Sequence, residues 1–172
     1  HEVGPDGRLA WDQLPRAAAY VGPMLNSVTA SSNGGGTSHA WGVRAQSGSF
    51  GMIDGKPLTA ASGADAPLMI EAKRAGKAIG IVNTASVTDA GTGTQLAVVS
   101  NRREHAAIAA QMLAAEPDVM LGGGERFFLP KGVMGVHGPG VREDGRNLIE
   151  EAQAKGYRVV RTRAELESAL KA

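Results

Sequence analysis

The last two thirds of the chain alternate between helix-like and strand-like hydrophobic patterns. Residues 68–75 carry apolar side chains at helical spacing and are followed by Gly76, a residue that commonly ends helices. Residues 78–83 then form a short apolar run, which is typical of a buried strand. The same succession returns in residues 101–115, an alanine-rich helical pattern, and in residues 118–121, a strand pattern that ends at three glycines. The spacing therefore predicts two successive helix–strand units.

The C-terminal part of the chain predicts a third unit of the same kind. Residues 143–155 have a helical pattern that Gly156 ends, and residues 157–161 form a strand pattern. Thr162 with Glu165 three residues later is a capping box, which predicts a last helix. Helices that alternate with short strands indicate an α/β fold, a parallel sheet with crossover helices on its faces.

The first third of the chain has a different composition, because glycine and serine dominate its loops. Residues 1–65 therefore form a loop-rich region, and residues 66–172 hold the alternating helices and strands. A length of 172 residues with 42% hydrophobic residues is enough for one core. We expect residues 1–172 to be a single α/β domain or part of one.

Charge and composition exclude several classes of partner. Lysine and arginine number 18 against 17 acidic residues, without a block of like charge, so no nucleic-acid or anionic-membrane partner is expected. No run reaches the roughly 18 to 20 apolar residues of a membrane span. Cysteine is absent, which excludes disulfides but leaves the compartment open. The start at His1, with Glu2 and Asp6 in place of a basic segment, indicates a processing or truncation point rather than a signal peptide.

Three loops should meet where the strands end, since ligands bind parallel sheets at the carboxyl ends of their strands. These loops are the turn around Ser31 and Ser32, residues 84–94 and residues 122–126. The serines, with the glycines after them, suit an anion or a nucleophilic hydroxyl at a helix start, although such stretches are also ordinary surface loops. The turn has neither the lysine of a P-loop nor a G-x-S-x-G elbow, which argues against nucleotide hydrolysis and serine-hydrolase chemistry.

The polar residues that follow allow two readings each. Asp89 suits the role of a metal ligand or of a carboxylate that supports a metal ligand. An Asx turn explains this residue equally well. Arg102 suits a phosphate-binding guanidinium or a solvated charge before a helix. The histidines lack the spacing of a zinc site and are interpreted as surface or packed residues; they are His39, His105 and His137.

Several sequence blocks occur in one collinear order. They are Gly42-Val43-Arg44, Gly55-Lys56-Pro57-Leu58, residues 72–84, Asp118-Val119-Met120-Leu121-Gly122-Gly123-Gly124 and Arg142-Glu143-Asp144-Gly145-Arg146-Asn147-Leu148. In this order they resemble the alkaline phosphatase family over nearly the whole chain. The resemblance implies a three-layer α/β/α fold and a phosphomonoesterase that forms a phosphoserine intermediate with the help of Zn²⁺ and Mg²⁺.

The resemblance also suggests which serine would be the nucleophile. Carried across without gaps from Gly42, the nucleophile position falls on Ser32, and Ser31 stands where the family has an aspartate. A shift by one residue, which aligns Val28 and Thr29 with the Val-Thr of the family, makes Ser31 the nucleophile instead. We prefer Ser32 and keep Ser31 as the alternative.

The same carry-over assigns the other site residues. Arg102 falls on the arginine that holds the phosphate oxygens, and Asp89 falls beside the third metal. Gly91 stands where the magnesium-ligand threonine belongs, with Thr92 directly after it, so Asp89 and Thr92 are the candidate metal residues. This departure weakens the magnesium site.

The resemblance further implies a phosphate monoester substrate, a homodimer and a periplasmic or secreted location. The remaining metal ligands of the family lie upstream and downstream of the segment that this chain matches. We therefore expect the chain alone to have little phosphatase activity. The alternatives are a non-catalytic phosphate- or anion-binding module and a structural α/β module without a ligand.

Overall fold

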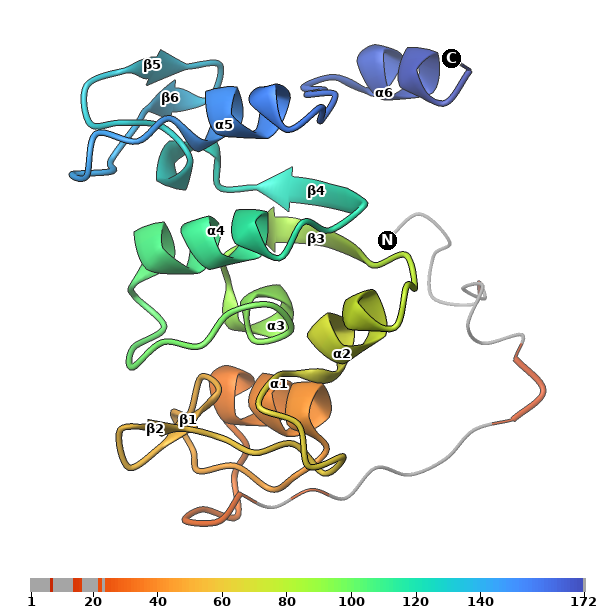
Figure 1. The fold of residues 1–172 in the computed structure, drawn as a ribbon, viewed down its shortest axis with the longest axis vertical. Helices are drawn as coiled ribbons and strands as arrows, with labels where there is room; N and C mark the ends of the chain where they lie inside the picture. The colour runs from red at the N-terminus through yellow and green to blue at the C-terminus, as the bar shows by residue number, and fades with distance from the viewer. Residues whose placement is uncertain (1–6, 8–13, 17–21, 23, 172) are drawn as a thin grey trace.

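The computed structural model describes residue 7, residues 14–16, residue 22 and residues 24–171 (Figure 1). The predicted processing or truncation point rests on His1, Glu2 and Asp6, which lie outside the described residues. The helices are α1 (Ser32–Trp41), α2 (Leu68–Arg74), α3 (Ala90–Gly93), α4 (His105–Ala114), the 3-10 helix η2 (Glu125–Phe127), α5 (Leu148–Ala154) and α6 (Arg163–Ala169). The strands are β1 (Met52–Ile53), β2 (Lys56–Pro57), β3 (Gly80–Ser86), β4 (Val119–Gly123), β5 (Met134–Gly135) and β6 (Gly138–Pro139).

The parallel pair β3 and β4 lies in the middle of the molecule (Figure 1). Gly80 pairs with Val119, and the register holds through the next two residues of each strand. The carboxylate of Asp118 sets the start of this pair, because it accepts a hydrogen bond from the Ile79 amide at 2.8 Å and one from Lys73 Nζ at 3.0 Å. The parallel α/β architecture predicted from the alternation of helices and strands is confirmed.

The main hydrophobic core lies on one face of this strand pair. Ile79 and Ile81 pack there with Ile108 and Met112 of α4, and side chains of α2 and α3 complete the cluster. In the first residues of β3 the burial alternates, and the side chain of Val82 is 71% exposed. The prediction of a buried strand was therefore wrong for one of its two faces, because the described helices cover only the other face.

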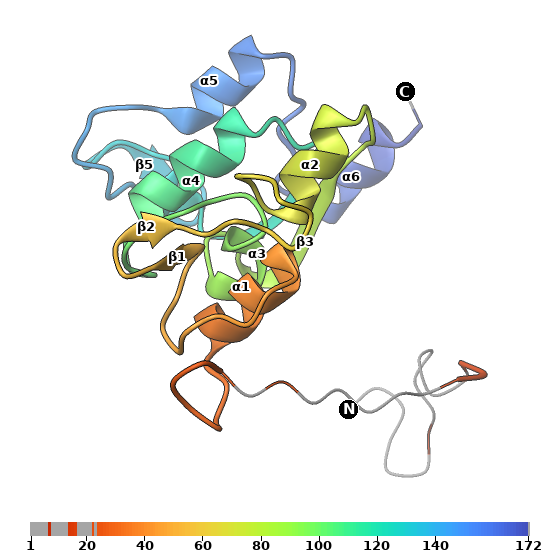
Figure 2. The same cartoon turned by 60° about the horizontal axis from the view of Figure 1, so that its bottom comes forward.

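Two further groups of elements flank the core (Figure 1). At one end, beside the β1–β2 hairpin, α1 packs with the residues that follow the hairpin in a small cluster centred on Trp41. At the other end, α5 packs on α4 through Leu148, Ala109 and Leu113, beside the β5–β6 hairpin. Figure 2 shows α1 lying against α3, the contact that joins the first group to the core.

Two predicted helices begin later than their patterns indicated. The helix expected over residues 101–115 begins at His105, because the Glu104 carboxylate accepts the Asn101 amide at 2.8 Å and closes a turn. The helix expected over residues 143–155 begins at Leu148, because the Asn147 side chain caps its first amides. Both helices end where the sequence predicted.

The strand expected over residues 157–161 is not formed. Strand conformation needs a neighbouring strand for its backbone hydrogen bonds, and no described strand lies beside this segment. Tyr157 instead bonds back to α5 through its amide and to the Pro117 carbonyl through its hydroxyl, at 2.7 Å. Beyond this segment, the capping box of Thr162 and Glu165 is present and begins α6, as predicted.

Within the described part of the chain, no helix combines the length and the apolar character that crossing a bilayer requires. The longest helices have ten residues.

Candidate functional site

The N-terminus of α1 is built by Ser31, the residue before the helix. Its hydroxyl oxygen accepts hydrogen bonds from the Gly34 amide at 3.1 Å and from the Gly48 amide at 3.0 Å. The Asn33 side chain donates to the Gly48 carbonyl at 2.6 Å, so the loop around Gly48 is tied to the helix start from both sides. The Ser31 side chain is therefore used as a helix cap and loop anchor.

Ser32 is the first residue of α1 and is exposed. Within the described residues its hydroxyl makes no hydrogen bond. The unpaired amides of the first helical turn carry a partial positive charge, which favours an anion at this position. Of the two candidate serines, Ser32 thus has the hydroxyl that is not already engaged.

The middle of α1 packs closely against α3 at Gly36. A methyl group added at Gly36 would lie 2.6 Å from Thr94 Oγ1 and 2.8 Å from the Ala90 carbonyl oxygen. Ser32 precedes Gly36 by four residues, about 6 Å along the helix axis. Because Ala90 directly follows Asp89, this packing holds the helix that begins at Ser32 against the helix that Asp89 precedes.

Asp89 and Arg102 form an ion pair at the start of α3. The distance between Asp89 Oδ1 and Arg102 Nη2 is 3.5 Å, and the two side chains are 40% and 42% exposed. The residues come from different segments, Asp89 from the loop after β3 and Arg102 from the turn before α4. The structure therefore brings together two residues that the sequence could only place separately.

Thr92 has its hydroxyl committed to the backbone. Thr92 Oγ1 donates to the Val87 carbonyl at 2.6 Å and accepts from Asn83 Nδ2 at 3.3 Å. Within the described residues no group of three histidine, cysteine or acidic side chains is arranged to hold a metal ion. A zinc site takes about four protein or water ligands, so these residues do not form a metal centre by themselves.

His105, the first residue of α4, lies beside the Asp89 loop. Its Nδ1 is 2.9 Å from Thr88 Oγ1, which in turn is 2.8 Å from Ser86 Oγ. Its ring stacks on Phe127 with 4.2 Å between centroids.

Burial lowers the pKa of His105, and the nearby carboxylate of Asp89 only partly opposes this effect. The ring is therefore mostly uncharged at neutral pH. In the sequence, the link between His105 and this site is that His105 lies three residues after Arg102.

The glycines after β4 let the third loop approach the second. The Val87 amide donates to the Gly123 carbonyl at 3.1 Å. Gly124 has a left-handed backbone conformation, and a side chain there would collide with Ser86. The expectation that these two loops meet at the ends of the strands is confirmed.

These features define a parallel α/β protein in which a serine helix, an aspartate–arginine pair and a glycine turn gather at the carboxyl ends of two strands. Among families of known proteins, the model of the alkaline phosphatase family, described as "Alkaline phosphatase", matches residues 1–172. The chain belongs to the alkaline phosphatase family.

Individual relatives agree with this assignment. The chain is 30% identical to an alkaline phosphatase of Gadus morhua over 176 residues, which cover 87% of this chain and 37% of the cod protein. The crystal structure of Thermus thermophilus alkaline phosphatase superimposes with a TM-score of 0.70 at 36% identity, over 84% of this chain and 27% of that protein.

A third comparison supports the fold alone. A variant of the alkaline phosphatase from the Antarctic bacterium TAB5, with Mg bound in its M3 site, superimposes with a TM-score of 0.72 at 20% identity. The match covers 92% of this chain and 41% of that protein. The chain spans between 26% and 40% of the length of the curated relatives that it matches.

Proposed function

We propose that this chain is the phosphate-binding segment of a metal-dependent phosphomonoesterase, with Ser32 as the nucleophile and Arg102 as the residue that binds the phosphate oxygens. The observation that carries the proposal is the packing of α1 on α3 at Gly36, which places the helix that begins at Ser32 against the helix that follows Asp89, the partner of Arg102. Membership of the alkaline phosphatase family supplies the reaction class.

The local geometry favours Ser32 over Ser31 for nucleophilic attack. An attacking oxygen must reach the phosphorus, and the Ser31 oxygen already accepts two backbone amides. Ser32 is exposed at the positive end of α1, where the dipole of the helix favours a phosphate group. The planar guanidinium of Arg102 can hold two phosphate oxygens at once.

The metal ions of the reaction would take most of their ligands from segments other than those described. A bound metal would lower the pKa of the serine hydroxyl and offset charge on the phosphoryl group. In this proposal Zn²⁺ and Mg²⁺ are the metals, and Asp89 contributes at most one ligand or a supporting carboxylate. Because Thr92 Oγ1 is bonded to Val87 and Asn83, we propose no ligand role for it.

Phosphate binding tests the proposal directly. We expect the purified chain to bind inorganic phosphate in isothermal titration calorimetry, and Arg102→Ala to weaken binding about tenfold or more, since a charge-assisted bond is lost. Arg103→Ala is the matched control, because Arg103 is the exposed neighbour and should leave the affinity unchanged. Equal losses in the two variants would contradict the assignment of Arg102.

A second candidate is a non-catalytic anion-binding module, in which the exposed start of α1 at Ser32 and the guanidinium of Arg102 would hold an anion without any chemical step. Hydrolysis of a chromogenic phosphate ester, with Zn²⁺ and Mg²⁺ added, separates the two. Phosphate binding that chelators leave unchanged, together with no turnover when the missing segments are supplied, would favour the module. Brisk turnover by the 17.7 kDa chain alone would instead overturn the argument that its metal site is incomplete.

We also propose a phosphate monoester substrate, a homodimeric assembly and a periplasmic or secreted location for the whole enzyme. These rest on membership of the family. Cell fractionation and light scattering of the full-length protein would test the location and the assembly.

A further inference from the structure

Two contacts join the loop after β3 to the turn that begins α4. One is the ion pair between Asp89 and Arg102, at 3.5 Å and with both side chains about 40% exposed. Exposed ion pairs of this kind contribute little and hold their side chains loosely. The ion pair alone therefore does not fix the direction of the Arg102 guanidinium.

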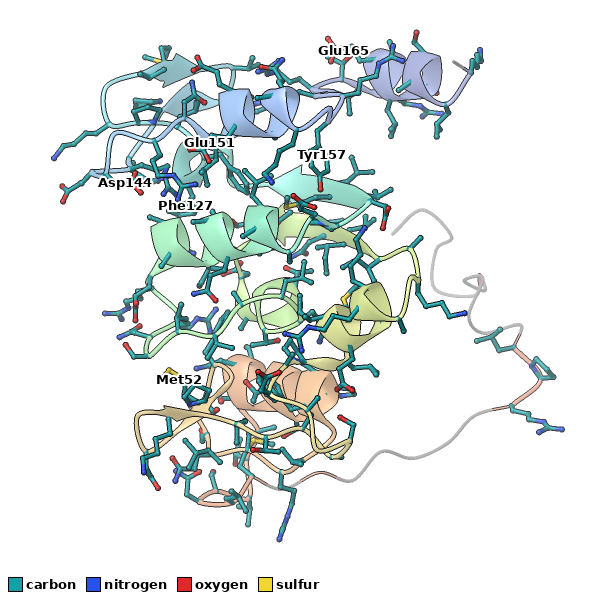
Figure 3. All side chains as sticks on the ribbon, viewed as in Figure 1. Met52, Phe127, Asp144, Glu151, Tyr157 and Glu165 are labelled. Carbon is teal, nitrogen blue, oxygen red and sulfur yellow. The ribbon has the colours of Figure 1, made fainter. Side chains whose placement is uncertain are left out.

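The other contact is the hydrogen bond between His105 Nδ1 and Thr88 Oγ1, at 2.9 Å. Thr88 is fully buried, and its hydroxyl also lies 2.8 Å from Ser86 Oγ. The histidine ring is held from the other side by its stacking on Phe127, which lies between α4 and α5 in Figure 3. This contact is shielded and geometrically defined, unlike the ion pair beside it.

The two contacts run in parallel between the same segments. Thr88 precedes Asp89 directly, and His105 follows Arg102 by three residues. This partly buried bond therefore sets the distance at which Asp89 and Arg102 face each other. We infer that His105 is a positioning residue, which holds the Arg102 turn against the Asp89 loop and so directs the guanidinium for phosphate. This inference rests on the proposed role of Arg102.

The test compares two substitutions at position 105 that place the same polar group at different distances from the backbone, and adds one substitution of the partner Thr88. Asparagine at position 105 puts an amide near the former Nδ1, whereas glutamine puts it near the former Nε2, and both lose the stacked ring. His105→Asn should therefore keep the bond to Thr88, and His105→Gln should lose it. Thr88→Val removes the same bond from the other side with little change in volume.

The first readout needs no ligand. Nuclear magnetic resonance relaxation of the Arg102 Nε–H group reports how firmly the guanidinium is held. We expect the order of this group to fall in His105→Gln and in Thr88→Val and to stay near the wild-type value in His105→Asn. Unchanged order in both His105→Gln and Thr88→Val would overturn the inference. So would equal losses in His105→Asn and His105→Gln.

The second readout is the affinity for inorganic phosphate. We expect a loss of about fivefold in His105→Gln, the factor that corresponds to one neutral hydrogen bond, and recovery in His105→Asn. In an Arg102→Ala background the same substitutions should have no further effect, since the positioning acts through Arg102. A further loss in that background would contradict the inference. If wild type binds no phosphate, the proposed function fails, while the relaxation measurement still decides the positioning role.

Discussion

At the residue scale, Ser31 and Ser32 show how neighbours with the same side chain come to do different things. The Ser31 hydroxyl oxygen accepts the Gly34 amide from the first turn of α1, and the amide of Gly48, far along the sequence, reaches the same oxygen. Ser32 begins the helix itself and turns outward. Their roles follow from one residue of offset at a helix start, where the direction of the backbone changes.

Substitution of the two serines should separate stability from phosphate chemistry. Ser31→Ala should lower the free energy of unfolding by about 1 kcal/mol, because the helix cap and the anchor of Gly48 are lost. Ser31→Asp, which keeps a capping oxygen, should restore most of that loss. Urea unfolding followed by circular dichroism measures both changes.

Ser32→Ala is the matched control for this experiment. Its hydroxyl makes no hydrogen bond among the described residues, so the stability should stay within about 0.5 kcal/mol of the wild-type value. A larger loss of stability in Ser32→Ala than in Ser31→Ala would show that the cap has been assigned to the wrong serine.

At the element scale, α1 is a helix that its own composition disfavours. It contains three glycines in succession, each of which costs helix stability relative to alanine. At Gly36 that cost is offset by close packing on α3, where no side chain fits. At Gly35 no atom beyond the neighbouring residues and the backbone of α1 itself lies within 4 Å of the position that a side chain would occupy, so the structure offers no packing reason for that glycine.

Alanine substitutions at these two glycines should therefore have opposite signs. Gly36→Ala should destabilise the chain by about 1 to 3 kcal/mol, since the new methyl group pushes α1 away from Ala90 and Thr94. Gly35→Ala should stabilise it by about 0.5 to 1 kcal/mol through the lower conformational entropy of the unfolded chain. Thermal unfolding of the two variants measures the difference, and a stabilising Gly36→Ala would refute the close packing of α1 on α3.

At the scale of the whole molecule, one buried arginine joins segments that are distant in sequence. Arg142 is 1% exposed, and its Nη1 donates to the Ala106 carbonyl of α4 at 2.8 Å and to the Phe127 carbonyl at 3.0 Å. Its remaining donors pair with the Asp144 carboxylate. Arg142 therefore holds α4, η2 and the segment before α5 in one arrangement.

Removal of this guanidinium should affect the assembly of the whole chain. We expect Arg142→Ala to lower the free energy of unfolding by about 3 kcal/mol, because two carbonyls and a carboxylate lose a buried partner. Arg142→Lys should recover little, since an ammonium cannot reach the same set of acceptors. The quantity to measure is the midpoint of chemical unfolding.

Arg146→Ala provides the comparison for a surface arginine. Arg146 pairs with Glu151 at 2.5 Å, and both side chains are more than a third exposed. Its loss should cost less than about 1 kcal/mol. If Arg142→Ala were no more destabilising than Arg146→Ala, the linking role of Arg142 would be wrong.

The sequence predicted which residues belong to the site, but not which contacts they make. Arg102 and Asp89 were identified by carrying the family resemblance along the chain, but their contact depends on two loops that meet in space. Thr92 was predicted as a metal residue, yet its hydroxyl bonds the Val87 carbonyl, a partner that no local pattern indicates. His105 was interpreted only as a surface or packed side chain, because neither Thr88 nor Phe127 is close to it in sequence.

The sequence by itself determined the order of helices and strands, the glycines that end helices, the capping box at Thr162 and the family resemblance. These features depend on conformational preferences that act over a few residues, or on sequence segments that occur in the same order as in the family. The tertiary structure decided which serine hydroxyl is engaged, which face of the strands is covered, and that residues 157–161 form no strand. Each of these depends on hydrogen-bond partners and burial supplied by distant segments, which spacing along the chain does not encode.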